Sequence, residues 1–317
     1  MRKLTNKIAL YAISFLVLVS LPFFLDSWNN YFLHIIIMCG VYTILALSLN
    51  LLVGYAGQFI LGHAAFYGIG AYATALLMVD LQWSFFPAII GGAIISGFFG
   101  WLLGGLVMRM SGDYLGIVTL GFGEIVRLIF VHWMSLTRGP MGIPGIPPVS
   151  IFGFEFTGAV HYYFLILVLV LGTIWFMRKL VYSGIGLSLM TLREDETVAA
   201  SVGIKPFKLK VFAFVISATL AGVAGGFWAS YVSYISPDSF QYMESVNILS
   251  MVVVGGSGSI PGSILGAFIL TISPEILRFT SEYRMIMIGL ILVIMMIWKP
   301  EGFLGEKYRK KNLYGKG

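Results

Sequence analysis

LREDETVAASVGIKPFKLKVFAFVISATLAGVAGGFWASY, residues 192–231, changes within a few positions from strongly charged to almost entirely apolar. Residues 193–196 are four charged residues in a row, and they include three of the 14 acidic residues of the chain. The run 211–232 is long enough to cross a membrane, because about 20 helical residues at ~1.5 Å each span ~30 Å of hydrocarbon. The stretch therefore predicts a helical membrane protein with a charged, helix-forming segment outside the lipid.

The whole chain shares this apolar character. Of its 317 residues, 58% are hydrophobic and 11% are charged, and the mean hydropathy is +0.92, far outside the soluble range. The runs lack the alternation of a membrane β-barrel, and lipid cannot satisfy an open backbone. We predict an all-α, polytopic membrane protein with a single transmembrane domain over residues 1–317. About ten spans are expected, at roughly 8–25, 32–53, 60–79, 85–108, 115–133, 161–177, 211–232, 244–256, 262–279 and 283–298. The eighth run is too short to cross upright, so it is either tilted or re-entrant.

The distribution of Lys and Arg sets the orientation, because cytoplasmic loops carry the excess of both. If ten spans alternate from a cytoplasmic N-terminus, sixteen of the 20 Lys and Arg residues are cytoplasmic and three are external. The external ones are Arg138, Arg278 and Arg284. We predict that both termini are cytoplasmic. The net charge of +6 then belongs to the inner face, where it can contact anionic lipid, and no nucleic-acid partner is needed.

Two long loops interrupt the predicted spans. The inner loop, about 178–210, contains the charged stretch. Thr191 and Glu194 match a capping box, acidic residues occupy the first turns, and Gly203 is a C-cap. These signals predict one helix of about eleven residues over 192–202, too short and too charged to cross lipid. Its narrow apolar face carries Leu192, Ala199 and Val202.

The outer loop, about 134–160, is rich in Pro and Gly and is expected to be stiff and non-helical. It is either a surface connector or a contact surface for an external partner.

No motif for chemistry stands out. The glycine pattern at 68–73 lies inside an apolar run and follows no strand, and GGSGSIPGS lacks the ending of a phosphate loop. The four His residues lack ligand spacing, so no metal or cofactor is expected. Glycines four residues apart, such as Gly222 with Gly226, are typical of close helix packing in lipid.

Glu124 and Arg127 lie three residues apart near the middle of the fifth predicted span. An isolated charge there costs several kcal/mol, so we expect the two to pair. The pair either fixes helix packing or lies near a transport path. Four further polar residues in or beside the second and third spans have the same two interpretations: Asn50, Gln58, His63 and Tyr67.

Several stretches resemble the LivM-type permease of branched-chain amino acid ABC importers. They are GYAGQFILGHAAFYGIGAYATALL (54–77), GDYLGIVTLGFGEIVRLIF (112–130), RGPMGIPGIP (138–147), the opening stretch, and VVVGGSGSIPGSILGAFIL (252–270). The resemblance covers about residues 40–305 in order. It implies a location in the bacterial cytoplasmic (inner) membrane. It also implies that the charged segment is a coupling helix that docks in a groove of an ATPase.

The family's coupling signature places Glu, then paired Ala, then Gly, which the chain matches only loosely because its Glu and Ala pair are not adjacent. The residues implied in coupling are Arg193, Glu194, Asp195, Glu196, Ala199, Ala200 and Gly203.

The resemblance also implies the partners: a homologous LivH-type permease chain, two cytoplasmic ATPase subunits and an extracytoplasmic solute-binding protein. The permease itself would be no enzyme, since ATP would be hydrolysed by the separate subunits. Related permeases carry urea or short amides, so the solute stays open. The alternative is an ion-coupled secondary carrier, which needs ionisable residues at the midplane, and only Glu124 and Arg127 are candidates.

Overall fold

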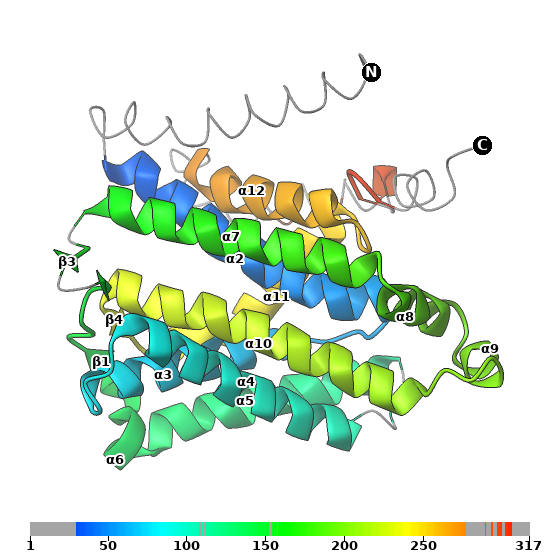
Figure 1. Cartoon of the computed structure of the whole chain (residues 1–317), viewed down its shortest axis with the longest axis horizontal. Helices are drawn as coiled ribbons and strands as arrows, with labels where there is room; N and C mark the ends of the chain where they lie inside the picture. The colour runs from blue at the N-terminus through cyan, green and yellow to red at the C-terminus, as the bar shows by residue number, and fades with distance from the viewer. Residues whose placement is uncertain are drawn as a thin grey trace.

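The computed structural model is an array of helices lying side by side (Figure 1). It describes residues 30–107, 110, 112–151, 154–156, 158–276, 289, 293, 297–299 and 302–305. The predicted span 8–25, most of the predicted span 283–298, and the basic residues near both termini lie outside these residues. The prediction of ten spans therefore remains a prediction.

The long elements follow the apolar runs closely. They are α2 (Asn30–Asn50), continued by the π-helix η1 (Leu51–Tyr55), α3 (His63–Val79), α4 (Phe85–Val107), α5 (Asp113–His132), α7 (Ala159–Val181), α10 (Pro206–Val232), α11 (Tyr242–Gly255) and α12 (Ile260–Ile276). Within the described residues, five helices are long and apolar enough to cross a membrane: 31–55, 85–107, 113–132, 159–181 and 206–232. The polytopic all-α fold is confirmed at this level.

The connecting elements lie at the two ends of the helix array (Figure 1). One end carries α6 (Met134–Thr137), η2 (Gly139–Met141), β1 (Ile143–Pro144), β2 (Ser150–Ile151), β3 (Phe154–Glu155), β4 (Tyr234–Ile235) and η3 (Pro237–Phe240). The other end carries α8 (Gly184–Glu194) and α9 (Glu196–Ser201). We call them the α6 end and the α9 end.

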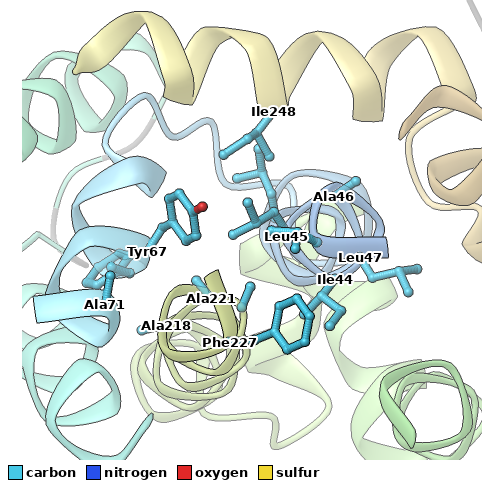
Figure 2. Packing of buried hydrophobic residues seen from close by; sticks show 14 of the residues in the cluster. Ile44, Leu45, Ala46, Leu47, Tyr67, Ala71, Ala218, Ala221, Phe227 and Ile248 are labelled. Carbon is cyan, nitrogen blue, oxygen red and sulfur yellow. The ribbon is translucent and has the colours of Figure 1, made fainter. Parts of the chain in front are cut away.

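Helix α10 lies at the centre of the packing, against α3, α4 and α2. Close approach explains Gly222: a Cβ there would lie 2.6 Å from Ser96 Cβ, so the predicted packing role of this residue is confirmed. Figure 2 shows the space enclosed by α2, α3, α10 and α11, into which Leu45, Tyr67 and Ala221 project, with Ile248 above them. Side chains therefore fill this space.

Two of the shorter apolar helices, α3 and α12, are each preceded by a short non-helical segment. Residues 56–62 leave the π-helix before α3 begins, and residues 256–259 form a turn between α11 and α12. Helix α11 has 14 residues, about 21 Å at ~1.5 Å per residue. This is less than the ~30 Å of a bilayer core, which agrees with the expectation that the eighth run cannot cross upright.

The loop after α5 is packed onto the helices. The prediction of a non-helical loop is largely right, apart from the single turns α6 and η2. Strand β1 pairs with β4 directly after α10, and Val149 N donates to Tyr162 Oη at 3.2 Å. Arg138 Nη2 lies 3.4 Å from Asp80 Oδ1. These contacts fasten the loop to three other parts of the chain at the α6 end: β4, α7 and the C-cap of α3.

Candidate functional site

The charged stretch forms two helices where the sequence predicted one. Helix α8 ends at Glu194, Asp195 is extended, and α9 begins at Glu196. Asp195 Oδ1 accepts hydrogen bonds from Thr197 N at 2.7 Å and Val198 N at 3.0 Å. An Asp side chain caps a helix start better than it continues a helix, so the chain breaks at this residue.

The predicted capping box was therefore wrong. The Thr191 hydroxyl donates to Leu187 O at 3.0 Å inside α8, and the N-cap of α8 is Ser183. The predicted helix end was right, although the C-cap itself is Val202: Gly203 follows it with φ +87°, and its N–H donates to Ala200 O at 3.1 Å. Ile204 N donates to Ala199 O at 3.1 Å, which completes a Schellman motif.

The hydrogen bonds from Val198 N and Thr197 N, in that order, lower the pKa of Asp195 below its ordinary value of 3.8. They stabilise the charged form of the carboxylate.

The two alanines of α9 face opposite ways. Ala199 has 0% of its surface exposed and is covered by the chain itself, whereas Ala200 is exposed. Val202 is also exposed, so the predicted apolar face is right for Leu192 and Ala199 only. The Ala199 side chain has its neighbours within the chain, and its part in coupling stays a prediction. Ala200 and Gly203 remain open to a docking partner.

Glu196 is held by a lysine on the next helix. Lys210 Nζ lies 2.7 Å from Glu196 Oε2; the lysine side chain is 4% exposed and the glutamate side chain 51%. The pair joins α9 to α10 across 14 residues of sequence. From the sequence, Lys210 was only one of the sixteen basic residues predicted to be cytoplasmic, and its pairing with Glu196 was not foreseen. A basic residue in the first turns of an apolar helix is the signal that could have marked it.

Arg193 reaches from α8 to the end of the π-helix. Its Nη1 donates to Gly54 O at 2.6 Å, and a Cβ on Gly57 would lie 2.9 Å from Arg193 Cγ. The chain leaves the helix soon after Gly54, so an arginine here caps a helix C-terminus from outside.

The last residue of α2 and Gly54 of the π-helix both lie against the turn between α11 and α12. Asn50 Oδ1 accepts from Gly258 N at 2.8 Å, and Asn50 Nδ2 donates to Ser259 O at 3.3 Å. A Cβ on Gly54 would lie 2.2 Å from Gly258 N. We call the group Arg193, Gly54, Asn50 and Gly258 the helix-break junction. It connects α8 to both breaks in the membrane helices.

These contacts agree with the packing interpretation of Asn50, which was one of the two expected; the other was a place near the transport path. His63 is similar: it is fully buried, and its Nε2 lies 2.8 Å from Ser48 Oγ. Gln58 is buried and donates to Ala56 O at 3.2 Å. Tyr67 packs edge-on against Phe240 with 5.1 Å between ring centroids. The structure does not bring these side chains together into one polar site.

Glu124 and Arg127 form the expected ion pair. Arg127 Nε and Nη2 lie 2.9 Å and 2.6 Å from Glu124 Oε1. The side chains are 39% and 24% exposed for glutamate and arginine respectively. Most of α5 is not covered by the rest of the described chain. The pair therefore lies on a part of the helix that the rest of the described chain leaves partly uncovered.

Among the residues that the structure describes, no three His, Cys, Asp or Glu side chains gather as a metal site would require. The contacts attach α8 and α9 to the helices η1 and α10, and α5 holds Glu124 and Arg127 as an ion pair.

Comparisons with known proteins point in the same direction. Residues 31–296 match the family described as the branched-chain amino acid transport system permease component. The chain is 38% identical to the high-affinity branched-chain amino acid transport system permease protein LivM of Salmonella typhimurium, over 95% of this chain and 76% of that protein. Identity to LivM of Escherichia coli is 37% over the same shares. The LivH permease of Salmonella typhimurium is 25% identical over 84% of this chain and 92% of LivH. No solved structure matches.

Proposed function

The chain belongs to the permease components of branched-chain amino acid transport systems, and on this basis we propose that it is a membrane-spanning subunit of an ABC importer. The solutes are leucine, isoleucine and valine. The observation that carries the proposal is the 38% identity to LivM over 95% of the chain, which includes both loops.

In the proposed assembly this chain forms half of the translocation pore and a LivH-type permease forms the other half. The similarity to both LivM and LivH relatives supports a pair of homologous permeases. Two ATPase subunits bind at the α9 end and a solute-binding protein binds at the α6 end. The chain has ten transmembrane helices in the bacterial inner membrane, with both termini in the cytoplasm.

Orientation is supported by the charges on the described loops. Lys205 and Lys208 belong to the start of α10, which lies at the α9 end, and Arg138 directly follows α6 at the α6 end (Figure 1). In intact cells an impermeant thiol reagent should label a Cys at 138 and spare a Cys at 208. The native Cys39 is buried and does not interfere. Labelling of position 208 would overturn the orientation.

The coupling region of the proposal is α9 with its flanks. Glu194, Ala200 and Gly203 are exposed there, and small side chains allow a helix to enter a groove. Arg193, Asp195 and Glu196 hold this surface in place through Gly54, the α9 amides and Lys210 respectively. ATPase closure would thus reach the membrane helices through rigid contacts.

The intramembrane pair completes the proposal. Glu124 and Arg127 lie on the open part of α5, and a charge exposed to lipid is costly. We place them beside the translocation path or the LivH-type half, where water or polar groups can solvate them.

Co-purification followed by reconstitution tests the function. The chain is co-expressed with its LivH-type partner and the two ATPases, purified as a complex, and placed in liposomes with the solute-binding protein. Uptake of leucine, isoleucine and valine should require ATP and all subunits. Urea is the comparison solute. Uptake by the chain alone, driven by an ion gradient, would establish the secondary carrier instead.

A further inference from the structure

We propose that a groove between α8 and the start of α10 binds an anionic phospholipid. The groove has a volume of about 450 Å³. It is lined by Gly184, Ile185, Ser188, Gly203, Ile204, Lys205, Lys208, Leu209 and Phe212. Two lysines thus line the groove together with apolar residues, and none of the lining residues is acidic. An anionic headgroup with apolar tails matches both parts of this lining.

The two lysines carry positive charge that the described part of the chain leaves uncompensated. Lys205 is the N-cap of α10 and Lys208 lies in its first turn; both are exposed, and both line the groove. Among the described residues neither makes an ion pair, whereas nearby Lys210 is paired with Glu196. The amino terminus of α10 adds positive potential at the same place. The groove therefore favours an anion at its rim.

We place the groove at the depth of the lipid headgroups. Helix α10 has 27 residues, about 40 Å at ~1.5 Å per residue, and exceeds the ~30 Å hydrocarbon core. Its first turns therefore reach the headgroup layer when the rest of the helix spans the membrane. At the same end of the molecule, Lys179 Nζ lies 4.5 Å from the centre of the Trp175 ring, a pairing typical of the membrane interface.

The floor of the groove leads down α10 into the membrane. Leu209 and Phe212 lie below the lysines, and Ile216 and Leu220 follow at helical spacing. All four side chains are partly exposed. A lipid tail can follow this stripe into the hydrocarbon, which a soluble ATPase cannot. This continuity favours lipid over protein as the occupant.

Native mass spectrometry of the purified full-length chain tests the site. The chain is mixed with phosphatidylglycerol and phosphatidylethanolamine in equal amounts. We expect preferential retention of phosphatidylglycerol. Lys205→Gln with Lys208→Gln should weaken that retention about 30-fold, which is ~2 kcal/mol at ~1.4 kcal/mol per factor of ten, or ~1 kcal/mol per lysine. Ser188→Trp should also reduce it, because the indole fills the groove without a change of charge.

The matched control is Lys179→Gln with Lys299→Gln, which removes the same charge outside the groove. It should retain the lipid, and every variant must elute as a single species in gel filtration. The proposal is overturned if this control loses as much lipid, if the groove variants lose none, or if millimolar inorganic phosphate releases the lipid. Loss of ATPase co-purification in the groove variants, with lipid retention unchanged, would assign the groove to the ATPase. The measurement needs no transport, so it stands apart from the importer proposal.

Discussion

Lys210 Nζ lies 2.7 Å from Glu196 Oε2, and the lysine side chain is almost completely buried while the glutamate side chain is half exposed. The contact joins the short helix α9 to the longest described helix of the chain, α10. A six-residue helix is not stable by itself, so its position depends on such contacts. We therefore expect a movement of α9 to be passed to α10.

Glu196→Gln should loosen α9. The variant leaves the buried Lys210 ammonium with a neutral partner, at a cost between those of exposed and buried ion pairs. We expect the α9 amides to exchange with deuterium about ten-fold faster, which corresponds to ~1.4 kcal/mol. The charge-reversed pair Glu196→Lys with Lys210→Glu should restore slow exchange in part. Unchanged exchange in Glu196→Gln would show that the pair does not hold α9.

Arg193→Ala should uncouple ATP hydrolysis from transport. It removes the hydrogen bond to Gly54 O and with it the contact between α8 and the helix-break junction. We expect normal membrane levels and normal basal ATP hydrolysis, with uptake lowered at least ten-fold and stimulation by the binding protein lost. Arg193→Lys should recover part of the uptake, because it restores a donor without the guanidinium geometry.

The control for this variant is Arg178→Ala, an arginine from the last turn of α7. It should leave uptake unchanged. Full uptake in Arg193→Ala would exclude the junction as a route for coupling.

Ala200→Trp and Ala199→Trp should fail in different ways. Ala200 is exposed, so the bulky residue should leave the protein level normal but block docking of the ATPase. Overpacking costs about 1–3 kcal/mol, which weakens docking about five- to hundred-fold. Ala199 is fully buried, so the same change there should lower the amount of folded protein.

ATPase co-purification and membrane levels measure the two effects separately. Gly203→Trp is a poorer test, because φ at Gly203 is +87° and a tryptophan is strained there whatever its partner. Normal ATPase co-purification with Ala200→Trp would remove α9 from the docking surface.

The N-cap of α9 should depend on pH. The pKa of Asp195 is lowered in the folded chain, first by Val198 N–H and then by Thr197 N–H. Its stabilising contribution is therefore present above the ordinary value of 3.8 and is lost as pH falls through the lower, folded-state pKa. Amide exchange at Thr197 and Val198, corrected for intrinsic rates, should lose protection in that range. Asp195→Asn keeps a neutral cap and should abolish the pH dependence; a dependence that persists in it belongs to another group.

Arg127→Leu should reduce assembly by leaving the Glu124 carboxylate in the membrane without its cation. Arg127→Leu with Glu124→Leu should recover part of the protein level, measured by quantitative blotting of membranes. A double variant that assembles but does not transport assigns the pair to the translocation path. If the double variant accumulates no better than the single one, the ion pair does not account for the defect.

Features set by neighbours in sequence were predicted well. The apolar runs located the long helices, since the need to satisfy the backbone in lipid leaves helices as the solution. The i, i+3 spacing predicted the Glu124–Arg127 pair, and Gly203 marked the end of α9. The break at Asp195 was missed because Thr191 and Asp195 both offer a local cap, and the Asp195 carboxylate accepts the two α9 amide hydrogen bonds.

Contacts between distant segments were decided by the tertiary structure alone. Arg193 and Gly54 are 139 residues apart, and Asn50 and Gly258 are 208 apart. The adjacent Ala199 and Ala200 have the same side chain, yet only one faces the chain. Helical periodicity shows which residues share a face, but the neighbour that covers that face comes from another part of the sequence. The sequence by itself therefore determined a helical membrane protein with a charged segment outside the lipid, and packing determined how that segment is attached to the helices, because attachment requires groups that only folding brings within hydrogen-bond distance.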